Sequence, residues 1–178
     1  MHDLRTPLAT VLGFARTLQR GTLEPPKDQY VEMMVAAGEQ LGEILDDLGA
    51  LARIESERWE PNMQDVDSRQ IAAGAAQRLE GATAVGEGTA VRVDVDSAER
   101  AVYSLARCAL RHGGLDAITV EAEGSTIAVH PVTAAAAPVL TRQTLRDFGA
   151  AVAARVVDAL GGSVELEGER LVVRLPPA

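Results

Sequence analysis

Residues 2–8 read His-Asp-Leu-Arg-Thr-Pro-Leu, and this stretch decides how the rest of the chain is interpreted. Thr6 follows His2 by four residues, so in a helix the two side chains lie one turn apart on the same face. Pro7 lacks a backbone N–H and is expected to loosen or bend the helix at that turn. A neutral imidazole can attack phosphorus, and the neighbouring carboxylate of Asp3 can fix its tautomer and offset the developing charge. The stretch therefore predicts a nucleophilic histidine on a helix.

Length and composition limit the classes of protein that this chain can be. Its 178 residues suffice for one large or two small domains with a buried core. With 17 Lys and Arg against 26 Asp and Glu, the net charge is -9, which disfavours binding to nucleic acid or to an anionic membrane surface. Cys108 is the single cysteine, and the sequence contains no signal peptide and no membrane-length apolar run. We therefore predict a cytoplasmic protein without disulfides.

The first third of the chain predicts two amphipathic helices. Apolar residues recur at three- and four-residue steps up to Gly21 and again from Tyr30 to about Ser56, with a turn at residues 24–26. Two helices this apolar cannot cover their seam alone, so we predict a symmetric dimer that closes a four-helix bundle. At about 1.5 Å per residue the second helix is ~45 Å long and the first only ~28 Å. We therefore expect the first helix to continue upstream of Met1 by about ten residues.

The remainder predicts an α/β sandwich of three helices over a small mixed sheet. The expected helices lie near residues 68–79, 97–112 and 141–160. The expected strands are residues 91–95, a hairpin of 118–123 with 126–130, and a closing hairpin of 163–167 with 171–175. The stretch from Gly81 to Gly88 is rich in Gly, Ala and Thr, and we interpret it as a loop.

Two parts of the chain resemble the sensor histidine kinases of two-component systems. Residues 2–8 resemble the family's phosphoacceptor box, and residues 65–177 resemble its ATP-binding domain in the order and spacing of their elements. The resemblance implies a dimeric helical hairpin followed by an α/β sandwich of the histidine kinase ATPase type. It also implies three segments: a dimerisation and phosphoacceptor hairpin at 1–58, a linker at 59–64 and a degenerate ATP-binding domain at 65–178.

Several positions depart from the family's nucleotide-binding pattern. Cys108 stands where the family has a magnesium-binding asparagine, and a thiol is a poor ligand for that hard cation. Pro131 replaces the aspartate that meets adenine, and Asp147 replaces one glycine of the last pair, of which Gly149 remains. Between Pro131 and Thr141 there is little room for a lid over the phosphates. We therefore expect no bound cofactor, with ATP and magnesium only if the protein is an active kinase.

We also predict no metal site. The histidines and the cysteine show no spacing typical of zinc ligands. Cys108 is interpreted as a small buried hydrophobe, and His112 and His130 as surface or sheet residues.

The resemblance implies a role for each residue of the phosphoacceptor box. His2 would accept the phosphoryl group, Asp3 would orient and activate it, Arg5 would help to hold the group, and Thr6 would position water in a phosphatase reaction. The implied partner is the receiver domain of a response regulator, which supplies the aspartate and magnesium for transfer.

Three functions remain open at this point. The first is a histidine phosphotransferase or pseudokinase that relays phosphoryl groups through His2 without ATP. The second is the catalytic core of an active sensor kinase. The third is a non-catalytic dimeric module that docks a response regulator.

Overall fold

The computed structural model describes residues 2–21, 25–144 and 146–178, with side chains from Leu8 onward. The chain divides into two compact units, Met1–Gly49 and Ala50–Ala178. A helical N-terminal region followed by a mixed α/β domain is the fold class that the sequence predicts.

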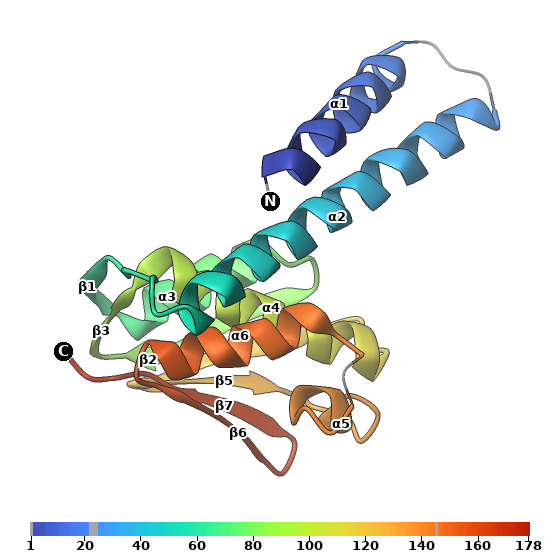
Figure 1. Cartoon of the computed structure of the whole chain (residues 1–178). Coiled ribbons are helices and arrows are strands. Elements are labelled where there is room, and N and C mark those ends of the chain that lie inside the picture. Colours follow the sequence, from blue (N-terminus) through green and yellow to red (C-terminus); the bar gives the residue numbers. More distant parts are fainter. Residues whose placement is uncertain (1, 22–24, 145) are drawn as a thin grey trace. The chain divides into compact units, whose positions relative to one another are not determined.

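The first unit is an antiparallel helical hairpin made by α1 (His2–Gln19) and the larger part of α2 (Lys27–Glu55) (Figure 1). Close packing between the helices depends on Gly38, because a Cβ at this position would collide with the side chain of Leu12. Arg16 and Glu39 add an ion pair of 2.9 Å between the helices. Both helices agree with the sequence prediction to within about two residues.

One face of α2 remains uncovered in the hairpin. The exposed positions recur at three- and four-residue steps: Tyr30, Met34, Ala37, Leu41, Ile44 and Leu48. On α1 the exposed apolar side chains are Val11, Phe14 and Leu18. The single hairpin therefore buries only part of the apolar surface that its sequence encodes.

The second unit contains two sheets. The larger is a five-stranded mixed sheet in the order β2-β4-β5-β7-β6, in which only β2 and β4 are parallel. Its strands are β2 (Ala82–Gly88), β4 (Ile118–Gly124), β5 (Thr126–His130), β6 (Ser163–Glu167) and β7 (Arg170–Arg174). The smaller sheet pairs β1 (Met63–Asp67) antiparallel with β3 (Ala90–Asp94). Both predicted hairpins, β4–β5 and β6–β7, are confirmed.

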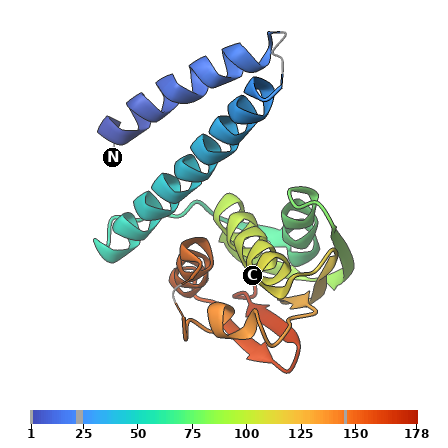
Figure 2. The same ribbon diagram turned by 90° about the vertical axis from the view of Figure 1, so that its right-hand side faces the viewer.

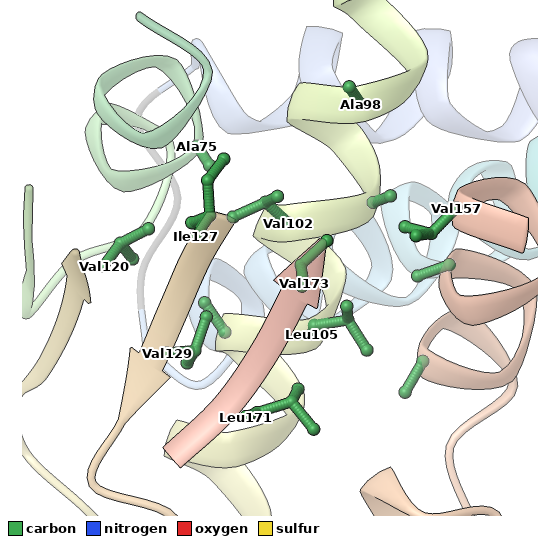
Figure 3. Close-up of a cluster of buried hydrophobic side chains, with 14 of the residues drawn as sticks. Ala75, Ala98, Val102, Leu105, Val120, Ile127, Val129, Val157, Leu171 and Val173 are labelled. Atoms are coloured by element: carbon green, nitrogen blue, oxygen red, sulfur yellow. The ribbon is translucent and has the colours of Figure 1, made fainter. Parts of the chain in front are cut away.

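Three helices pack on the sheet: α3 (Ser68–Gln77), α4 (Val95–Gly113) and α6 (Phe148–Ala159), with a short α5 (Ala137–Leu140) beside them (Figure 2). The core between these layers is built from small and branched apolar residues. Alternate residues of β5 and β7 face it, and from α4 Val102 and Leu105 enter the same cluster (Figure 3). Burial of these side chains is the main force that holds the unit together.

The stretch Gly81–Gly88 is the clearest error in the sequence interpretation, because it forms strand β2 rather than a loop. Its residues alternate in burial, and it pairs in parallel with β4 along its whole length. Gly86 has a φ of 85°, a conformation that side chains rarely adopt. The glycine that indicated a loop is therefore a position within a strand.

One helix boundary and one further strand differ from the prediction. The helix expected to begin near Thr141 begins only at Phe148, where the side chain of Asp147 caps it. Strand β1 was not predicted, because its two apolar residues, Met63 and Val66, are three positions apart and do not alternate with the amide and the acid between them. It exists through its pairing with β3.

Candidate functional site

The backbone of the phosphoacceptor stretch is helical, since α1 begins at His2. The side chains of His2, Asp3, Arg5 and Thr6 lie outside the described residues. Their predicted roles as acceptor, activator, phosphoryl contact and water-positioning group therefore stay predictions.

The four positions compared with the family's nucleotide-binding pattern, Cys108, Pro131, Asp147 and Gly149, lie in or next to α4, β5 and α6. Cys108 lies in α4 and is fully buried, and Pro131 directly follows β5 and is exposed. Asp147 is the N-cap of α6, and Gly149 lies in the first turn of the same helix. Of these positions, Cys108 and Asp147 meet in one cluster.

This cluster joins α4 to the start of α6. The Sγ of Cys108, a ring nitrogen of His112 and a carboxylate oxygen of Asp147 lie within 4.8 Å of one another. His112 Nε2 is 3.2 Å from Asp147 Oδ2, while Asp147 Oδ1 accepts a hydrogen bond of 3.0 Å from the backbone N–H of Ala150. We call these three side chains the Cys108–His112–Asp147 cluster. Among the described residues, it is the one group of three or more potential metal ligands that lie this close.

Burial and a neighbouring carboxylate determine the protonation state of the thiol. Burial raises the pKa of Cys108 to about 12, and the charge of Asp147 and its hydrogen bond with the thiol act in the same direction. The thiol is therefore protonated near neutral pH in the metal-free protein. A protonated, buried thiol is not a nucleophile, as the sequence analysis expected of Cys108.

Sequence reasoning missed the part that His112 takes in this cluster. Cys108 and His112 are four residues apart on α4, which places them on the same helix face. That spacing was a usable signal for two of the three members. The third, Asp147, lies 35 residues beyond His112, and only the folded structure brings it there.

A mainly apolar hollow lies beside Asp147 on the same unit. The hollow has a volume of about 350 Å³, and its lining includes Leu51, Phe148, Ala151 and Val152, together with Arg142 and Arg155. Asp147 is part of its wall. In the cluster, the side chains of His112 and Asp147 are 22% and 13% exposed, so solvent and ions reach both.

Comparison with known sequences identifies the first unit. Residues 1–57 match the His Kinase A (phospho-acceptor) domain family. The chain is 33% identical over 81 residues to the histidine protein kinase DivJ of Caulobacter vibrioides, covering 44% of the chain and 13% of that protein. It is 29% identical over 89 residues to the circadian input-output histidine kinase CikA of Synechococcus elongatus, covering 48% of the chain and 12% of that protein. The chain thus spans only a small part of these relatives.

Comparison with solved structures identifies the fold of the whole chain. Full-length ShkA in complex with AMPPNP matches 98% of the chain, which covers 44% of ShkA, with a TM-score of 0.70 and 21% identity. The Acinetobacter baumannii histidine kinase AdeS matches 99% of the chain, which covers 98% of that structure, with a TM-score of 0.62 and 18% identity. Within the described residues, no helix has both the length and the hydrophobicity needed to cross a membrane.

Proposed function

Because the chain belongs to the sensor histidine kinase family of two-component systems, we propose that it relays phosphoryl groups through His2 without using ATP. The group would move to or from an aspartate in the receiver domain of a response regulator. The observation that supports this proposal is the contrast between its two units. The phosphoacceptor sequence is complete, whereas two members of the Cys108–His112–Asp147 cluster, Cys108 and Asp147, replace the asparagine and the glycine that the family has at these positions.

In the relay, the imidazole of His2 attacks the phosphorus of an aspartyl phosphate. A P–N bond forms as the P–O bond breaks, and the electron pair leaves on the receiver's carboxylate. Asp3 orients the imidazole and offsets its developing charge, and Arg5 holds the oxygens of the moving group. Thr6 positions water when the phosphoryl group is hydrolysed instead.

The residues present in the second unit do not fit ATP with magnesium. A protonated thiol at Cys108 offers no oxygen ligand to the cation. Asp147 places a carboxylate at the N-terminus of α6, where a phosphate would otherwise meet free N–H groups. Its side chain already accepts the N–H of Ala150, so both charge and geometry oppose a phosphate there. The relay therefore takes its phosphoryl group from a protein donor.

The exposed stripe of α2 supports a homodimer. Six apolar positions at helical spacing remain uncovered in the hairpin, and a second copy related by a two-fold axis would cover them as a four-helix bundle. The hairpin at 1–58, the linker at 59–64 and the ATPase-like domain at 65–178 remain our proposed division of the protein.

One observation favours an active kinase as the second candidate function. ShkA, which shares the fold, has its structure in complex with AMPPNP. If the altered positions of this chain are compensated by other contacts, it would bind ATP and phosphorylate its own His2.

A phosphotransfer assay tests the proposal. The purified chain is mixed with receiver domains that carry a radiolabelled aspartyl phosphate, and acid-labile label on the chain is measured. We expect label on the wild type and none on the His2→Ala variant. Label that persists in His2→Ala would refute the assignment of His2. Stable receiver binding by both proteins, with no label on either, would instead favour the docking module.

A further inference from the structure

We propose that the Cys108–His112–Asp147 cluster is a binding site for a thiophilic divalent metal ion, with Zn²⁺ as the best-suited cation. The site does not include the phosphoacceptor histidine, and one of its ligands, Cys108, stands where the family has its magnesium-binding asparagine. Its three side chains offer one sulfur, one imidazole nitrogen and one carboxylate oxygen. These are the three ligand types that zinc takes from proteins, whereas Mg²⁺ prefers oxygen ligands alone.

The spacing of the ligand atoms suits a tetrahedral ion. Two ligands at about 2.0 Å from tetrahedral zinc lie ~3.3 Å apart, and His112 Nε2 and Asp147 Oδ2 are 3.2 Å apart. The sulfur lies within 4.8 Å of both ligand atoms. A Zn–S bond of ~2.3 Å needs separations of about 3.5 Å, so a small rotation of the Cys108 side chain completes the set.

The surrounding helices position all three ligand residues before an ion binds. Cys108 and His112 are on successive turns of α4, a helix of 19 residues. Asp147 uses Oδ1 to cap α6 through Ala150, while Oδ2 faces His112 Nε2, and an ion between these two atoms would replace their direct contact. This arrangement lowers the conformational cost of binding, since the helix cap does not have to break.

Three protein ligands leave a fourth tetrahedral position open. Partial exposure of the His112 and Asp147 side chains lets an ion, and a water molecule as its fourth ligand, approach from solvent. When the sulfur binds, the thiol proton passes to solvent and the thiolate bonds to the metal, with no change of oxidation state. The metal would link α4 to the start of α6.

Cobalt(II) is the probe for the test, because it takes zinc sites and its absorption reports thiolate bonding. The full chain, kept reduced and free of nucleotide, is titrated with Co²⁺. We expect a near-ultraviolet sulfur-to-cobalt charge-transfer band that saturates at one equivalent and disappears when Zn²⁺ is added.

Substitutions assign the band to individual ligands. Cys108→Ser should abolish the band. His112→Gln and Asp147→Asn, made as separate variants, should each weaken Co²⁺ binding by at least about tenfold. Asn at position 147 still caps a helix well, so the second variant should keep the start of α6. His130→Gln is the matched control, because His130 Nε2 lies 3.1 Å from Glu121 Oε2, a histidine–carboxylate pair without sulfur. Its affinity for Co²⁺ should equal that of the wild type.

The proposal is overturned if the folded wild type shows no charge-transfer band, or if the band survives in Cys108→Ser. Equal Co²⁺ affinities for wild type, His112→Gln and Asp147→Asn, each shown to be folded by circular dichroism, would also overturn it. No phosphodonor is present in this experiment, so its result is independent of the phosphoryl relay.

Discussion

Three aspartates begin the three longer helices that pack on the sheet of the α/β unit. Asp67 caps α3, Asp94 caps α4 and Asp147 caps α6, and in each case a carboxylate oxygen accepts a backbone N–H of the first turn. Such caps satisfy a donor that the helix cannot satisfy itself and place negative charge at its positive end. Asp147 alone combines this structural role with a place in the cluster.

Asp94 predicts an acid-sensitive contribution to stability. Burial alone would raise its pKa, but hydrogen bonds from Ser97 and from the backbone N–H of Asn62 outweigh this effect, and the pKa lies below its ordinary value. A carboxyl with a lowered pKa in the folded state stabilises the protein above its unfolded pKa. That contribution is lost as the pH falls through the lowered value. Asp94→Ala should therefore lower the free energy of unfolding by about 1 kcal/mol at neutral pH.

The measurement is urea unfolding of both proteins at neutral pH and at a pH below the carboxyl pKa. The difference between wild type and Asp94→Ala should shrink in acid. Asp94→Asn, which keeps the acceptor but not the charge, should retain most of the cap. A difference that stays constant with pH would show that the charge of Asp94 does not contribute.

At this scale the sequence predicted the chemistry of single residues better than their contacts. The phosphoacceptor stretch and the altered positions Cys108 and Asp147 could be located by motif and order alone. The contact of His112 with Asp147 could not be located in this way, because the two residues are 35 positions apart and meet only when α6 packs against α4. The spacing of Cys108 and His112 was visible but is common in helices that bind nothing.

Among the elements, β2 shows why a strand of small residues escapes sequence analysis. Its exposed and half-buried positions are filled by Ala, Thr, Val, Gly and Glu, without the large apolar residues that mark a buried strand. It is stabilised chiefly by its parallel pairing with β4, a contact between distant parts of the chain. Local propensity cannot report such pairing.

Gly86 gives β2 a direct test. Its φ is positive, and a Cβ there would collide with the backbone carbonyl of Ala122 on β4. Gly86→Ala should therefore destabilise the protein by more than about 1 kcal/mol, the usual effect of a strained residue alone. The control is Gly168→Ala, at a positive φ with open space around the added methyl group.

Thermal unfolding of the two variants measures the difference. Gly86→Ala should lower Tm clearly more than Gly168→Ala does. Equal shifts in Tm would mean that the close approach of β2 and β4 is unimportant for stability.

The uncovered face of α2 predicts the oligomeric state. Ile44 is 41% exposed within the apolar stripe, so a charge there would be buried in a dimer interface. Ile44→Glu should convert a dimer to a monomer in analytical ultracentrifugation. Ala36→Glu adds the same charge to an exposed position of α2 outside the stripe and should leave the dimer intact. Equal masses for wild type and Ile44→Glu would contradict the bundle.

For the whole molecule, the order of elements and the sequence of residues 2–8 were enough to predict the family and fold class. Periodicity located both long helices and both hairpins because their apolar patterns are strong. The cluster between α4 and α6 could not be predicted, since it is a property of tertiary packing. The cluster brings two altered positions, Cys108 and Asp147, together with His112 in one place.

In the proposed relay the second unit does not use ATP, so that His2 depends on a protein phosphodonor. A calorimetric titration of the full chain, shown to be folded by circular dichroism, with ATP in the presence of Mg²⁺ tests this claim. We predict no saturable heat of binding up to millimolar nucleotide. Binding at micromolar concentration would contradict the claim and would make the active kinase the better account of this protein.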